Sequence, residues 1–177
     1  LKLGLFLEET GYQFNTGQRL SVYLTNTLED YIKKSETLFE EFIAEESDQA
    51  ASIKRDKPVM VVIGNPPYSI RSQNLTSQAR KWVDAYRTVD GVEIKEKGAL
   101  QFEKNLQDDY IKFIRFAQWR IEQTNHGILA FVSNHTYLDS PTFRGMRQSL
   151  MQTFNTVHLL DLNGSSKKKG RNPHKSK

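Results

Sequence analysis

Residues 59–68 read VMVVIGNPPY. The apolar run at 59–63 has the length and β-branched composition of a buried strand, and Gly64 separates it from the tetrapeptide Asn-Pro-Pro-Tyr at 65–68. A buried strand that ends in this way brings an amide, a stiff turn and an aromatic ring to one point. The stretch therefore predicts both the kind of fold and the position of a site.

The tetrapeptide combines three chemical groups. Asn65 carries an amide oxygen that can accept a hydrogen bond from an amine. Pro66 and Pro67 have no N–H and a fixed φ, so the turn is stiff and its carbonyls face outward. Tyr68 offers a flat aromatic face on which a planar base or amide can stack. Together these groups suit the binding of an exocyclic amino group and the presentation of its nitrogen to an electrophile.

A purely structural turn is the alternative. Two prolines after a strand commonly end it, and Asn-Pro initiates turns. The continuous apolar strand before the tetrapeptide, the glycine at the junction and the tyrosine at its end favour the functional interpretation.

Hydrophobic periodicity predicts an alternation of helices and short strands. The helices are expected at about residues 1–10, 30–51, 105–124 and 141–154, and the strands at about 20–24, 59–63, 127–132 and 156–162. Gly11 is expected to follow the end of the first helix. This alternation indicates an α/β fold, mainly a parallel sheet flanked by helices. Residues 69–102 are polar and weakly periodic, with a helical turn expected near 82–86 and a tight turn at Asp90-Gly91. They are predicted to form an insertion or lid, and a disordered insertion is the alternative.

Polar residues follow several of the predicted strands. Asn26 follows the first strand, the tetrapeptide follows the second, and residues 133–137 follow the third. Ligands of parallel α/β sheets bind beyond the carboxyl ends of the strands. We therefore expect these residues to converge on one rim of the sheet.

The composition predicts one soluble globular domain. The chain has 177 residues, of which 37% are hydrophobic and 26% charged. No apolar run approaches the roughly 20 residues that span a bilayer, and the N-terminus does not read as a signal peptide. The absence of cysteine excludes disulfides and thiolate metal sites, and the four histidines lack metal-ligand spacing. We expect a cytoplasmic protein with no membrane association and no bound metal.

The charge is unevenly distributed. The formal net charge is +4, and residues 165–177 contribute six positive charges and no acid, which leaves −2 for the remainder. The globular part is therefore not a basic nucleic-acid-binding block. Residues 165–177 are expected to form a flexible basic tail or loop, with phosphate contact as the alternative.

Four stretches carry a family resemblance. They are LGLFLEETGY at 3–12, YLTNTLE at 23–29, GNPPYS at 64–69 and LLDLNGSSKKK at 159–169. In this order they resemble the gamma-class N6-adenine DNA methyltransferases. More narrowly, they are similar to the methyltransferase part of single-polypeptide (type ISP-like) restriction–modification enzymes. The resemblance implies a Rossmann-like fold, S-adenosylmethionine as cofactor and DNA as partner.

The resemblance also implies roles for individual residues. Asn65 and Pro66 would accept hydrogen bonds from the target amine, and Tyr68 would stack on the flipped adenine. The substrate-binding residues would be Pro67, Asn134 and Tyr137, and Asn26 would touch the adenine of the cofactor. A local structural role is the alternative for Asn26, Asn134 and Tyr137.

The family's glycine-rich cofactor loop is not found in this sequence. Residues 1–164 therefore resemble the central part of a methyltransferase catalytic domain, and the fold is expected to be partial. We expect the rest of a larger polypeptide to supply the upstream cofactor loop and a downstream target-recognition domain. This chain alone is then expected to be inactive.

Two other functions remain open from the sequence. The same tetrapeptide would serve a methyltransferase that acts on a protein glutamine amide or on RNA. The third possibility is a non-catalytic interaction or scaffold module in which the turn is only structural.

Overall fold

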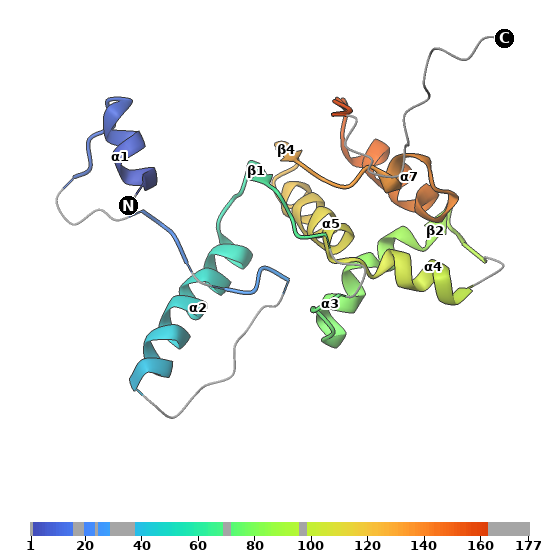
Figure 1. The fold of residues 1–177 in the computed structure, drawn as a ribbon, viewed down its shortest axis with the longest axis horizontal. Helices are drawn as coiled ribbons and strands as arrows, with labels where there is room; N and C mark the ends of the chain where they lie inside the picture. The colour runs from blue at the N-terminus through green and yellow to red at the C-terminus, as the bar shows by residue number, and fades with distance from the viewer. Residues whose placement is uncertain are drawn as a thin grey trace, which may run out of the picture. The chain divides into compact units, whose positions relative to one another are not determined.

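The structure is a computed structural model that describes residues 2–15, 20–23, 25–28, 38–68, 72–95 and 99–162 (Figure 1). It contains two compact units, residues 1–58 and 59–177. The predicted basic tail at 165–177 and the predicted start of the helix at residue 30 lie outside the described residues.

The described residues of the first unit form two helices, α1 at Lys2–Glu9 and α2 at Leu38–Asp56. Gly11 has a φ of 87°, which glycine adopts without strain. Its N–H donates to the carbonyl of Glu8, and the N–H of Tyr12 donates to the carbonyl of Leu7. These two bonds form a Schellman motif. The predicted end of the first helix at Gly11 is confirmed.

The predicted strand at 20–24 is wrong over its described residues, because residues 20–23 are irregular. A strand needs a partner to satisfy its backbone, and the described part of this unit contains none. Residues 25–26 are instead held by α2. Lys54 Nζ donates to Thr25 Oγ1 at 3.1 Å and to the carbonyl of Asn26 at 2.7 Å.

The second unit contains a parallel pair of strands, β1 at Val61–Gly64 and β4 at Ile128–Phe131. Their register pairs Val61 with Ile128 and Gly64 with Phe131. The predicted strands at 59–63 and 127–132 are thereby confirmed within one or two residues, as is the mixed fold with parallel pairing.

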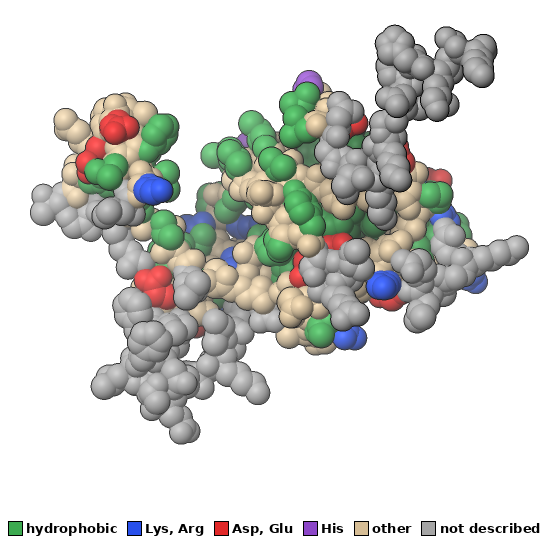
Figure 2. All heavy atoms as spheres, in the orientation of Figure 1, with side chains coloured by type: hydrophobic (Ala, Val, Ile, Leu, Met, Phe, Trp, Pro, Cys, Tyr) green, Lys and Arg blue, Asp and Glu red, His purple; other side chains and the backbone are tan. Residues whose placement is uncertain are grey.

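The two faces of this sheet differ in burial. Leu129 and Phe131 point to the core, where helix α5 at Asp109–Glu122 packs against both strands. On the other face, Val61 is 52% exposed, Ile63 77% and Ile128 61%. Figure 2 shows hydrophobic side chains gathered at the surface in this region.

Residues 72–95 and 99–106 are largely folded. They form α3 at Ser77–Lys81, a 3₁₀ helix η1 at Trp82–Tyr86, the hairpin strands β2 at Thr88–Val89 and β3 at Val92–Glu93, and α4 at Ala99–Leu106. Asp90 and Gly91 both have positive φ, as a type I′ hairpin turn requires. The predicted helical turn and tight turn are confirmed. Val83, Tyr86, Ile94, Phe102 and Leu106 join the main hydrophobic core, so this segment is part of the folded unit, and its role as a lid stays a prediction.

Two of the predicted helices are divided by local signals. The one expected at 105–124 corresponds to α5, and its first two residues instead end α4, because the side chain of Asp108 caps α5 by accepting from the N–H of Tyr110. The one expected at 141–154 becomes a 3₁₀ turn η2 at Pro141–Phe143 followed by α7 at Arg144–Thr153. Between β4 and η2 lies the short helix α6 at Thr136–Asp139.

The last predicted strand, at 156–162, is wrong. These residues are irregular and exposed, and Leu160 is 84% exposed. Apolar residues form a strand only where another strand offers its backbone. Within the described residues, β1 and β4 pair with each other and not with this segment.

Gly145 lies where α7 packs against the end of η1 and the start of the hairpin. A Cβ at this position would collide with the carbonyl oxygen of Tyr86 and lie 2.7 Å from that of Thr88. Backbone atoms cannot move aside as a side-chain tip can. We expect Gly145→Ala to destabilise the protein by about 1–3 kcal/mol.

The measurement is urea unfolding followed by tryptophan fluorescence, since Trp82 and Trp119 both lie in this unit. Gln152→Ala, at an exposed position on the same helix, is the matched control and should change stability by less than about 0.5 kcal/mol. Equal stability of the two variants would show that α7 can shift without cost.

Candidate active site

The sheet ends where the tetrapeptide begins. The carbonyl of Gly64 accepts from the N–H of Val132 at 3.0 Å, which continues the β1–β4 pairing by one step. A Cβ on Gly64 would lie 3.0 Å from Phe131 Cε1. The absence of a side chain therefore lets the phenyl ring of Phe131 pack closely against the end of β1.

Asn65 and Tyr68 are hydrogen-bonded to each other. Tyr68 Oη donates to Asn65 Oδ1 at 2.9 Å, and the carbonyl of Val132 lies 3.0 Å from the same hydroxyl. The single hydroxyl proton is thus within reach of two acceptors. Pro66 is buried between the exposed Asn65 and Pro67. The tetrapeptide is therefore a compact turn fastened to the ends of both strands.

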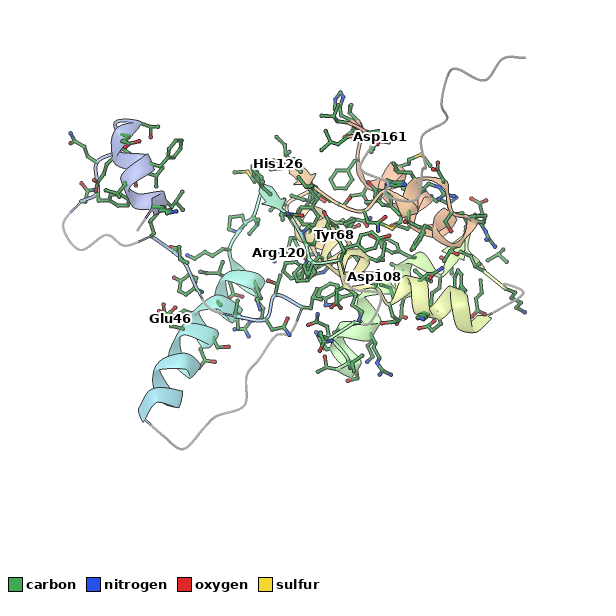
Figure 3. The ribbon with its side chains drawn as sticks, viewed as in Figure 1. Glu46, Tyr68, Asp108, Arg120, His126 and Asp161 are labelled. Carbon is green, nitrogen blue, oxygen red and sulfur yellow. The ribbon has the colours of Figure 1, made fainter. Side chains whose placement is uncertain are left out.

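The ring of Tyr68 is half exposed and supported from one side. It is 51% exposed, and the ring of Tyr110 meets it edge-on, with centroids 6.4 Å apart at 67°. Tyr110 is 2% exposed and lies in the first turn of α5, and burial raises its pKa far above the ordinary range. Figure 3 labels Tyr68 and, at the start of α5, Asp108. The buried, neutral ring of Tyr110 thus lies beside the accessible ring of Tyr68.

The loop after β4 brings two more predicted residues to this place. An open concave surface is lined by Gly64, Tyr68, Asn134 and Tyr137, among others. Pro67 belongs to the same turn, because it lies between Pro66 and Tyr68 in the tetrapeptide. The structure therefore places six predicted site residues at the carboxyl ends of β1 and β4. They are Asn65, Pro66, Pro67, Tyr68, Asn134 and Tyr137.

Asn134 and Tyr137 also have structural roles. Asn134 Oδ1 accepts from the N–H of Thr136 at 2.8 Å and from its Oγ1 at 2.6 Å, which starts helix α6. The carbonyl of Tyr137 accepts from Arg147 Nη1 at 2.7 Å, and the half-buried ring packs against the core. The oxygen of Asn134 is thus engaged locally, and substrate binding by either residue stays a prediction.

Asn26 lies in the first unit. Its Oδ1 accepts from the N–H of Leu28 at 3.1 Å, which is the local turn role that the sequence left open. A role in cofactor binding stays a prediction.

Sequence reasoning missed a buried polar cluster beside the tetrapeptide. Lys112 has 0% side-chain exposure and Asp109 3%, and their charged atoms lie 3.7 Å apart. Ser72 Oγ donates to Asp109 Oδ1 at 2.5 Å and accepts from Lys112 Nζ at 2.7 Å. We call Ser72, Asp109 and Lys112 the buried cluster. Its only sequence signal is an acid at the start of a helix with a lysine three residues later.

The environment shifts the pKa values of both charged groups. Burial alone would raise the pKa of the Asp109 carboxyl, but hydrogen bonds from Ser72 and from the N–H of Gln73, together with the charge of Lys112, hold it below its usual range. Burial lowers the pKa of the Lys112 ammonium, and Asp109 opposes that shift.

Two kinds of site do not occur in the described part of the chain. No group of three or more histidine and acidic side chains there has the geometry to hold a metal ion. Among the same residues, no helix combines the length and the apolar character that a bilayer crossing requires.

One of the three comparisons with known proteins gives a match. Residues 2–167 match the Eco57I restriction-modification methylase family, a range that extends over parts of both units and contains every predicted site residue. Neither the comparison with curated proteins nor that with solved structures found a match. The chain belongs to the Eco57I restriction-modification methylase family.

Proposed function

We propose that this chain carries the catalytic motif of an enzyme that transfers a methyl group from S-adenosylmethionine to the N6 amine of adenine in DNA. The enzyme would be a gamma-class methyltransferase, built as part of a larger, type ISP-like restriction–modification protein with a Rossmann-like catalytic fold. Family membership supports methyl transfer to DNA. One observation supports an amine as the target group: the acceptor oxygen of Asn65 lies beside the half-exposed ring of Tyr68.

The chemical problem is the low nucleophilicity of an aromatic amine, whose lone pair is delocalised into the ring. Asn65 Oδ1 and the Pro66 carbonyl would accept hydrogen bonds from the two N–H groups of the amine and favour a more tetrahedral nitrogen. They would also stabilise the positive charge that develops on it. These residues would present the nitrogen lone pair to the methyl group that the bound cofactor supplies, with the cofactor's sulfur as the leaving group, and the methylated amine would lose a proton to solvent. No side chain needs to act as a general base.

Tyr68 can release the acceptor that this chemistry needs. Its hydroxyl lies 3.0 Å from the carbonyl of Val132, so it can donate there alone when an amine approaches Asn65. No buried polar group is left unpaired by this exchange. The resting hydrogen bond thus holds the Asn65 amide in place without blocking it.

The cofactor supplies the electrophilic methyl group when it is bound. Asn26 is the residue proposed to contact its adenine. Asn26 Oδ1 accepts one hydrogen bond from Leu28, and an amide oxygen has a second lone pair, so it can also accept from the adenine amine.

The target adenine must leave the duplex to reach Asn65. Extrusion costs a few kcal/mol, which stacking would partly offset. The exposed face of Tyr68 is available for such stacking, and Tyr110 limits the motion of its ring from the other side.

The test uses the full protein that contains this chain. In three separate incubations, the full protein and tritiated S-adenosylmethionine are combined with unmethylated DNA, with RNA or with protein. The DNA product is then digested to nucleosides. We expect label in N6-methyldeoxyadenosine. Label only in RNA or in a protein glutamine would favour the alternative methyltransferases, and no transfer to any substrate would favour a scaffold module.

Substitutions of Tyr68 test the stacking role. Tyr68→Ala should weaken binding of the flipped base by about 1–3 kcal/mol, the usual contribution of one stacked aromatic ring. Tyr68→Phe should keep most activity, because the π-face remains and the Asn65 acceptor is left open. The measurement is KM for DNA at saturating cofactor. If the phenylalanine variant is as impaired as the alanine variant, the hydroxyl bonds matter and stacking does not explain the role of Tyr68.

A further inference from the structure

We propose that the buried cluster of Ser72, Asp109 and Lys112 is a positioning element that holds the base-stacking ring of Tyr68 in place. This inference rests on the proposed function, because it assigns the cluster to the same base-binding site. Nothing in the sequence motif points to these residues.

Most hydrogen bonds of the cluster join residues 72–74 to the start of α5, and Ser72 Oγ also bonds the backbone of Asn74. Lys112 Nζ donates to the carbonyl of Asn74 at 2.7 Å as well as to Ser72 Oγ. Asp109 Oδ2 accepts from the N–H of Gln73 at 3.1 Å. Residues 72–74 are therefore fixed to the helix by both charged side chains, through backbone as well as side-chain atoms.

Stability alone does not explain a cluster of this kind. Removing two charges from water costs several kcal/mol per ion, and well-packed apolar residues often serve a core equally well. The Nζ–Oδ1 separation of 3.7 Å also exceeds that of a direct hydrogen bond. What the pair provides instead is a set of directed hydrogen bonds, and these define one position for residues 72–74.

The same turn of α5 contacts Tyr68 directly. Tyr110 lies between Asp109 and Lys112 in the helix, and its ring meets that of Tyr68 edge-on. Ser72 follows Tyr68 by four residues. The start of α5 thus contacts the tetrapeptide through the ring of Tyr110. It also anchors the chain shortly after the tetrapeptide, through Asp109 and Lys112.

Loss of the anchor should therefore affect the placement of the target base. Ser72 carries the least disruptive test, because Ser72→Ala removes only one hydroxyl, which bonds Asp109, Lys112 and the backbone of Asn74. Ser72→Thr restores that hydroxyl. Arg115→Met is the matched control, since it breaks another ion pair of α5, between Arg115 Nη1 and Glu122 Oε1 at 3.0 Å.

The experiment uses the full protein and a duplex of the sequence that the wild-type enzyme is found to methylate. One duplex carries 2-aminopurine at the target adenine, so that its fluorescence reports extrusion of the base. We expect Ser72→Ala to lower kcat/KM for DNA about ten- to hundredfold and to reduce the fluorescence gain. Binding of S-adenosylmethionine should stay unchanged, and Ser72→Thr should recover both signals. Arg115→Met should lower the unfolding midpoint and leave kcat/KM and fluorescence near those of the wild type.

Wild-type kcat/KM and fluorescence in Ser72→Ala would overturn the inference, as would equal losses in Ser72→Ala and Arg115→Met. A wild-type enzyme that methylates DNA while Ser72→Ala behaves normally leaves the proposed function intact. A wild-type enzyme that does not methylate DNA overturns the proposed function and, with it, this inference.

Discussion

Asn65→Ala should remove most methyl transfer in the full protein, by about 10²–10³ in rate, and leave binding of S-adenosylmethionine nearly unchanged. The amide oxygen of Asn65 is the acceptor that the proposed chemistry directs at the amine. Its present partner is the hydroxyl of Tyr68 at 2.9 Å, which has the carbonyl of Val132 as a second acceptor. The substitution therefore removes a contact to the substrate and leaves no buried group unpaired.

Asn65→Asp is the sharper variant. A carboxylate also accepts hydrogen bonds, so partial activity fits an acceptor role, while its charge alters the site. Incorporation of tritiated methyl into DNA gives the rate, and calorimetric titration of the cofactor gives its affinity. Incorporation at the wild-type rate by Asn65→Ala would remove Asn65 from the mechanism.

The parts of the fold that the sequence predicts are those with a local cause. The apolar runs of β1 and β4 predict strands, and each has the other as a parallel partner, although the predicted burial holds for one face of the pair and not for the other. The runs at 20–24 and 156–162 carry a similar local signal, and their described residues are irregular. The difference between these pairs of runs is whether another strand lies beside them. The presence of a neighbouring strand depends on the fold of the whole chain and cannot be predicted from the apolar run alone.

The site shows the same division between local and distant causes. Asn65 and Tyr68 are three residues apart, so one short motif predicts both, and their hydrogen bond follows from the turn. Ser72 meets Asp109 and Lys112 across 37 and 40 residues. A single sequence offers no periodicity for a contact of that range, and charged residues in an amphipathic helix ordinarily predict a solvated face.

Asp109→Asn should destabilise the protein by about 3–5 kcal/mol, because it removes the counter-charge from the fully buried ammonium of Lys112. The shape of the side chain is kept, but an amide nitrogen cannot accept one of the two hydrogen bonds that Ser72 and Gln73 donate, so the loss includes that bond as well as the charge. Urea unfolding of the wild type, Asp109→Asn, Lys112→Met and the double variant gives a double-mutant cycle. The double variant should recover a large part of the loss, since it leaves no unpaired charge in the core. Additive losses would show that the two residues act separately.

The same residue predicts how stability changes with pH. The folded pKa of Asp109 lies below its unfolded value of about 3.9, so the folded state holds this proton more weakly than the unfolded state does. Its contribution is fully present above that unfolded value and is lost as the pH falls through the lower folded pKa. The stability of the wild type should therefore decline more steeply below about pH 4 than that of Asp109→Asn, and the two curves should converge in acid. Parallel curves over this range would mean that the carboxyl has the same pKa in both states and that its bonds to Ser72 and Gln73 contribute no net stability.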